Sequence, residues 1–226
     1  TKLGRQPPTI KNEEAGITED IAKLGTRLNH MNTSYNKKEG TVYNNKAVKE
    51  AYEDLREYID NLETQREIDK ITEIKDCTTK LGRQPPRNKK EEAGITEDIA
   101  KLGTRLQHMN TAYNKKEGPI YNNKAVKEAY EHLREYIDNL ETQREIDRIT
   151  EIKDCTTKLG RKPPPMKNEE AGITEDIAKL GTRLHHMTKA YNKKEGPIYN
   201  NKAVKEAYEH LREYIDNLET QREIDK

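Results

Sequence analysis

Apolar positions recur at helical spacing through most of the chain. Along residues 95–113 they lie four and three residues apart, at Ile95, Ile99, Leu102, Leu106, Met109 and Tyr113. Such a narrow stripe predicts an amphipathic helix. Thr96, followed by two acidic residues, is typical of a helix start, and the sequence leaves open a start nearer Asn88. Lysines followed by Gly118 and Pro119 predict its end.

A second, longer helix is predicted from Asn122 to Gly160, because this stretch contains no Gly or Pro before its last residue. Its first half has a broad apolar face, wider than one partner helix covers. Its second half has a stripe at every third residue, from Ile146 to Cys155. A wholly polar segment, 141–145, separates the two halves and shifts the hydrophobic register. We expect the first half to pair with the shorter helix of its own repeat. The second half would bridge to the shorter helix of the next repeat, or meet a partner.

The same pattern occurs three times. Thr-Lys-Leu-Gly-Arg begins at Thr1, Thr79 and Thr157, at intervals of 78 residues. We therefore divide the chain into helical repeats 1–78, 79–156 and 157–226, the last lacking the counterpart of 149–156. We expect an excerpt of a longer array. The predicted fold class is all-α: a tandem array of 78-residue αα-hairpins, each with a shorter and a long helix, extended or solenoid-like.

Differences between the copies are expected at loop or solvated positions. They include Asn29/Gln107/His185, Asp54/His132/His210, and Asn32-Thr33-Ser34 against Thr188-Lys189-Ala190. The apolar anchors of the predicted helices do not change. This contrast supports assigning the apolar stripes to the packed faces.

The composition favours small helical units over one large core. Charged residues make up 37% of the chain and hydrophobic residues 31%, with neither Phe nor Trp. The 42 basic and 41 acidic residues are interleaved, so no surface for nucleic acid is predicted. No apolar run approaches the ~20 residues of a membrane span, so no membrane insertion is predicted. Cys77 and Cys155 are expected to be free thiols of a cytoplasmic, cytoskeletal protein.

No pattern for catalysis or metal binding is found in the sequence. Phosphate loops, Cys-x-x-Cys, His-Glu-x-x-His and calcium loops are all absent from it. His185, His186 and His210 are the one set considered as metal ligands, and partly exposed helix histidines are the favoured interpretation. We predict no enzyme activity, catalytic residue, metal or cofactor.

The remaining candidates are helix faces that bind a partner. Tyr is the only aromatic residue, and it is common at interfaces because it combines apolar area with a polar tip. Half-buried packing within the chain is the competing interpretation. The candidate partner-binding residues are Tyr52, Tyr58, Ile59, Ile68, Ile71, Ile74, Tyr130, Tyr136, Ile137, Ile146, Ile149, Ile152, Tyr208, Tyr214 and Ile215.

Arrays of long, charge-rich helices joined by short breaks resemble cytoskeletal rods of the spectrin-repeat kind. They also resemble giant repeat scaffolds that carry centrin or spasmin along contractile fibres. The resemblance is one of layout over the whole chain, and no residue motif carries it. It implies a scaffold that provides spacing, load bearing or multivalent docking, with other copies of the repeat, in the same or neighbouring chains, as partners. The alternatives are a backbone for EF-hand calcium sensors, bound at 145–159 or at Tyr130 and Tyr136, and a repetitive surface antigen.

Overall fold

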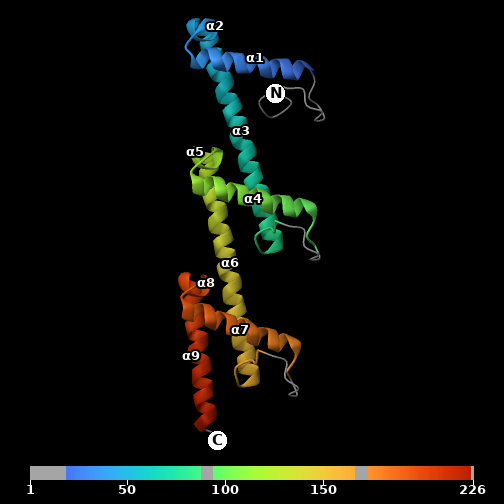
Figure 1. The fold of residues 1–226 in the computed structure, drawn as a ribbon, viewed down its shortest axis with the longest axis vertical. Helices are drawn as coiled ribbons and strands as arrows, with labels where there is room; N and C mark the ends of the chain where they lie inside the picture. Colours follow the sequence, from blue (N-terminus) through green and yellow to red (C-terminus); the bar gives the residue numbers. More distant parts are fainter. Residues whose placement is uncertain (1–18, 88–93, 166–172, 225–226) are drawn as a thin grey trace. The chain divides into compact units, whose positions relative to one another are not determined.

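The computed structural model describes residues 19–87, 94–165 and 173–224. Within these ranges every regular element is an α-helix, which confirms the all-α class. Figure 1 shows their order: α1 (Glu19–Asn36), α2 (Gly40–Asn44), α3 (Lys46–Leu81), α4 (Glu97–Lys115), α5 (Pro119–Asn122), α6 (Lys124–Leu159), α7 (Glu175–Lys193), α8 (Pro197–Asn200) and α9 (Lys202–Ile224).

The chain forms two compact units, Thr1–Leu133 and Arg134–Lys226. Their boundary lies within the long helix α6, away from the repeat boundaries after residues 78 and 156. The reason is visible inside each unit, where the second half of a long helix packs against the helices of the following sequence copy. A structural unit therefore combines parts of successive copies.

Side-chain caps set the helix starts. Thr96 Oγ1 accepts a hydrogen bond from the Ile99 amide at 3.4 Å, so α4 begins directly after Thr96. The alternative start near Asn88 falls on residues outside the described ranges. Asn123 Oδ1 accepts from the Val126 amide at 3.2 Å, which identifies Asn123 as the cap of α6.

The connection between the shorter and the long helix forms a corner with its own short helix. In the second copy, Lys116 closes α4 in the left-handed region (φ 61°), and Gly118 precedes α5 with φ 70° and ψ −177°. The second combination is one that essentially only glycine adopts. Ile120 of α5 is buried against the neighbouring helices. This short helix was not predicted from the sequence.

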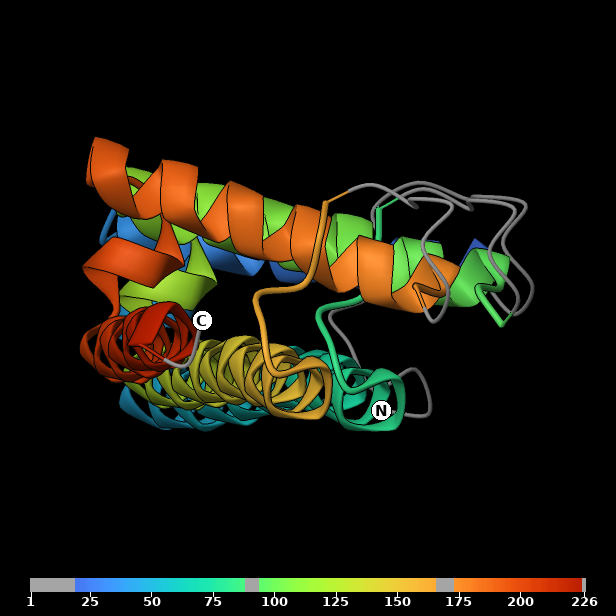
Figure 2. The ribbon, with the colours of Figure 1, turned by 90° about the horizontal axis from the view of Figure 1, so that it is seen from below.

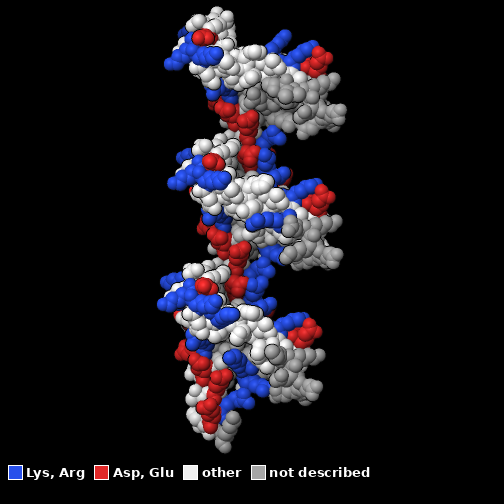
Figure 3. Space-filling model, in the orientation of Figure 1, with Lys and Arg blue, Asp and Glu red and all other residues white. Residues whose placement is uncertain are grey.

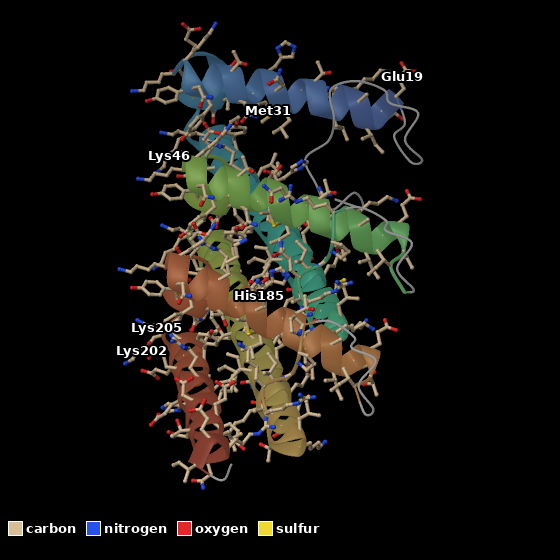
Figure 4. The ribbon with its side chains drawn as sticks, turned by 60° about the horizontal axis from the view of Figure 1, so that its bottom comes forward. Glu19, Met31, Lys46, His185, Lys202 and Lys205 are labelled. Carbon is tan, nitrogen blue, oxygen red and sulfur yellow. The ribbon has the colours of Figure 1, made fainter. Side chains whose placement is uncertain are left out.

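Because of the corner, the shorter helix crosses the long helix of its own copy. In the first unit α1 runs across α3 (Figures 1 and 2). Glu19 at the start of α1 and Lys46 at the start of α3 lie at opposite ends of α1 (Figure 4). The arrangement differs from the expected hairpin of antiparallel neighbours, since α2 turns the chain before α3 begins.

In the second unit, α7 lies across both α6 and α9 (Figures 1 and 2). The core is where these three helices and α8 meet. Its buried members are Ile149, Ile152, Leu184, Met187, Ile198, Val204, Tyr208, Leu211 and Ile215. The expected bridge from the second half of the long helix to the next shorter helix is present here, through Ile149, Ile152 and Leu184.

One glycine in α4 and one in α7 lie against the backbone of the loop that follows the preceding long helix. A Cβ at Gly103 would lie 2.3 Å from the Pro86 carbonyl oxygen, and one at Gly181 would lie 2.0 Å from the Pro164 carbonyl oxygen. Next to the second glycine, Thr182 Oγ1 donates to the Pro165 carbonyl at 2.7 Å. A loop contact therefore explains the glycine at both positions.

We predict that Gly103→Ala destabilises the chain. An exposed helical Gly→Ala change normally stabilises by about 1 kcal/mol. Here the methyl group meets backbone atoms, so a loss of about 1–3 kcal/mol is expected. Urea unfolding followed by circular dichroism measures the change. Thr111→Lys is the control, because position 111 is exposed and its counterpart in the third copy is Lys189. An unchanged or increased Gly103→Ala midpoint would contradict the contact.

Candidate functional site

We use the term junction for the contact among the second half of one long helix, the crossing helix that follows it and the first half of the next long helix. In the second unit, Asn201 Nδ2 donates to Thr142 Oγ1 at 2.7 Å, and the Thr157 and Tyr214 hydroxyls lie 2.7 Å apart. The partners are 59 and 57 residues apart in sequence, so α6 and α9 run in parallel. The overlap from Thr142 to Thr157 covers about 22 Å at ~1.5 Å per residue.

Apolar burial stabilises the junction more than its ion pairs do. Ile152 and Val204 are fully buried, and Ile149 and Leu211 are nearly so. Each such side chain contributes roughly 1.5–3 kcal/mol relative to full exposure. The ion pair between Arg183 and Glu151 spans 3.3 Å with side chains 40% and 61% exposed. A pair exposed to this extent contributes about 0–1 kcal/mol.

The first unit contains the same polar contacts. Asn123 Nδ2 donates to Thr64 Oγ1 at 2.7 Å, matching Asn201 and Thr142. Arg105 pairs with Glu73 at 2.9 Å, matching Arg183 and Glu151. Each of the four residues of the first unit has an identical counterpart 78 positions later in the second unit, as the printed sequence shows. The junction is therefore a repeated feature of the chain.

A tyrosine cluster fixes the crossing helix to the long helix at each corner. In the third copy the Tyr191 ring lies 5.1 Å from the Tyr208 ring and 5.8 Å from the Tyr199 ring. The Tyr208 hydroxyl donates to Thr188 Oγ1 at 2.8 Å, and burial raises the pKa of Tyr208. Asn110 takes the place of Thr188 in the second copy and accepts from Tyr130.

The position of Asn110 and Thr188 was expected to be solvated, yet it is half-buried in all three copies. Asn and Thr both offer an oxygen that accepts a hydrogen bond, and this shared property explains which residues occupy the position. A comparison of the copies shows the substitution, but only the fold shows the buried tyrosine hydroxyl that requires it.

Most candidate partner-binding residues pack inside the chain. The buried ones are Tyr52, Ile71, Ile74, Tyr130, Ile137, Ile149, Ile152, Tyr208 and Ile215. The half-buried ones are Ile59, Ile68, Tyr136, Ile146 and Tyr214. Tyr58 is the exposed member of the set, at 50%. In this conformation the set therefore serves mainly for packing between the chain's own helices.

Sequence reasoning missed several junction residues. The Asn–Thr pairs, such as Asn201 and Thr142, stand 59 residues apart, and no local pattern links such positions. Val204 and Leu211 lie on the broad apolar face of a long helix, and their second partner, the preceding long helix, was not predicted. The one available signal was the width of that face, which exceeds what a single crossing helix covers.

The two cysteines are free and buried. Burial raises the pKa of both the Cys77 and the Cys155 thiol, which lowers the fraction of reactive thiolate. Lys and Arg side chains gather at the corners near α2, α5 and α8, and Asp and Glu side chains lie along the long helices, with uncharged surface between them (Figure 3). Among them, Lys202 and Lys205 project away from α9 (Figure 4).

Across residues 19–87, 94–165 and 173–224, no group of three or more His, Cys, Asp or Glu side chains is placed to hold a metal ion. The His185 and His186 rings lie 5.9 Å apart, edge to face. No helix in the described part of the chain is both long and apolar enough to cross a membrane. No family model, curated protein or solved structure matches this chain.

We predict that Thr142→Val weakens the junction. The change keeps the shape of the side chain but removes the acceptor for Asn201 Nδ2, so the free energy of unfolding should fall by about 1 kcal/mol. Urea unfolding followed by circular dichroism measures it. Thr150→Val in the same helix is the control, because Thr150 is exposed and its hydroxyl donates to the Ile146 carbonyl of its own helix. Equal losses in the two variants would contradict a role for the Thr142–Asn201 bond.

Proposed function

We propose that this chain is a non-enzymatic structural protein, a tandem-repeat scaffold that holds successive 78-residue copies at a fixed spacing. The observation that supports this proposal best is the recurrence of the junction. Thr64–Asn123 and Thr142–Asn201 are the same contact, made twice along one chain at the same 2.7 Å. A repeated interface of this kind fixes the geometry of one copy against the next.

The parallel, staggered overlap also suits spacing and load bearing. Its two sides are different surfaces, the second half of one long helix and the first half of the next. Because the two surfaces differ, each copy can offer one of them to the copy before it and the other to the copy after it. Stability then depends on each copy and on its contacts with its immediate neighbours.

Docking of an EF-hand calcium sensor is the competing proposal. It would use segment 145–159 or the face with Tyr130 and Tyr136. In the described structure Tyr130, Ile149 and Ile152 are buried. A sensor that binds these residues must therefore open the junction first. An experiment that detects this opening can distinguish the two proposals.

Spin labels placed across each junction test the spacing function. One pair joins positions 69 and 128, and its counterpart joins 147 and 206, so that each pair links two long helices within one compact unit, and all four positions are exposed. Cys77 and Cys155 are replaced by Ala in this background. We expect the same narrow distance distribution at both junctions, because both are built from the same contacts.

Broad or unequal distributions would contradict a fixed spacing. The measurement is repeated with a calcium-loaded, centrin-like sensor, with the calcium-free sensor as control. Unchanged distances and unchanged mass support the self-contained scaffold. Broadened distances, together with a gain in mass of one sensor per repeat, would favour the docking alternative.

A further inference from the structure

We propose that the lysine-rich corner of one chain enters an acidic cleft of a second copy of the chain, so that scaffold chains associate side by side. The inference rests on the proposed function, because it names a partner of the scaffold and the surfaces that join the two. The basic corners are defined as residues 37–49, 115–127 and 193–205. The acidic clefts are the two that contain Asp60 and Asp138.

Each basic corner is a charged patch at the end of a crossing helix, where Lys and Arg side chains gather near α2, α5 and α8 (Figure 3). In the second corner, Lys124 pairs with Glu128 at 3.8 Å. Lys115 and Lys116 are exposed and form no ion pair among the described residues. The other two corners repeat this pattern 78 residues away in each direction. Two positive charges at each corner are therefore available to an outside partner.

The backbone of the corner shows that the lysine side chain is not needed for the turn itself. Lys116 closes α4 in the left-handed region at φ 61°, and Lys38 and Lys194 do so at φ 59°. Glycine adopts this conformation at a lower cost and is the usual residue at such helix ends. The turn is closed by backbone hydrogen bonds, such as that from the Lys116 amide to the Tyr113 carbonyl at 3.0 Å. The feature that lysine adds is its charge.

A cleft of about 640 Å³ in the second unit offers the opposite charge, and its walls come from α6 and from the corner that contains α8. Among its charged residues, Glu145 pairs with Arg148, which leaves Asp138, Glu141 and Arg144. Asp138 and Glu141 are exposed and form no ion pair among the described residues. Two carboxylates against one arginine give this cleft an excess of negative charge.

The first unit contains the same cleft, with a volume of about 660 Å³. Asp60, Glu63 and Arg66 occupy the positions 78 residues before those of the second unit. Glu67 again pairs with a base four positions beyond Arg66, here Lys70. Basic corners and acidic clefts thus recur at the same sequence interval, and the number of complementary surfaces grows with the number of copies.

A second copy of the chain is the partner that fits both surfaces. The chain has 42 basic and 41 acidic residues, so a net charge of +1 causes little repulsion between copies. An acidic polymer would engage the corners and leave the clefts unused. Because the charges on both surfaces are exposed, each contact is weak by itself and is screened by salt. Side-by-side association should therefore be strongest at low ionic strength.

Sedimentation velocity of the full chain at neutral pH tests the contact in about 0.01 M and about 1 M salt, where charges act over roughly 30 Å and 3 Å. We expect association at low salt and monomers at high salt. Replacing Lys38, Lys116 and Lys194 together by Gly should weaken the association at least tenfold. The same change should raise the urea midpoint, because glycine relieves the left-handed backbone.

The matched control replaces Lys23, Lys101 and Lys179 together by Gln. These exposed lysines lie near the other end of each crossing helix and recur at the same interval, so the control removes the same net charge. Its association should equal that of the unaltered chain.

An exchange of charge tests the pairing of the two surfaces. One chain carries Glu in place of Lys38, Lys116 and Lys194, and a second chain carries Asp60→Lys and Asp138→Lys. Each chain alone should associate at least tenfold more weakly than the unaltered chain, because like charges then meet. A mixture of the two should recover association. All five positions are exposed, and circular dichroism verifies that both chains remain helical.

The inference is overturned if the unaltered chain stays monomeric at low salt, if the glycine variant associates as strongly as the glutamine control, or if the mixture does not associate. The spin labels within each unit report on the scaffold separately. Narrow, equal distances without side-by-side association would retain the scaffold and remove only the contact between chains, whereas broad distances would count against the scaffold itself.

Discussion

Burial of Ile149 and Ile152 of one long helix against Val204 and Leu211 of the next is the interaction on which the second unit depends. The long helices are rich in charged residues, and an isolated helix of this kind is only marginally stable in water. The apolar face of each long helix is buried from water only when another long helix and a crossing helix cover it. The local geometry follows from this requirement: parallel overlap of the long helices, and a crossing helix placed over both.

Two glycines make this packing possible. Gly118 takes a backbone conformation closed to other residues and allows the corner, so that the shorter helix leaves the axis of the long one. Gly103 admits the Pro86 carbonyl, which ties the loop after α3 to the crossing helix. Neither glycine contributes apolar area. Their positions determine where the apolar faces of the neighbouring helices can pack together.

Much of the local structure could be predicted from the sequence, and the partners of each face could not. Thr96 caps its helix as the capping pattern indicates, and the long uninterrupted stretch is one helix, Lys124–Leu159. These features depend on residues within one or two turns of each other. The corner helix and the parallel neighbour depend on contacts tens of residues away, such as Thr142 with Asn201. A hydrophobic pattern shows which face is buried without showing what buries it.

The dependence of each copy on its neighbours is measured most directly by unfolding chains of one, two and three complete copies under identical conditions. If the junction provides most of the apolar burial, the urea midpoint and the unfolding free energy should rise with each added copy, and a single copy should be marginally folded. Equal midpoints for one and three copies would contradict the account. They would show that each copy is stabilised from within and that the junction is a contact without energetic consequence.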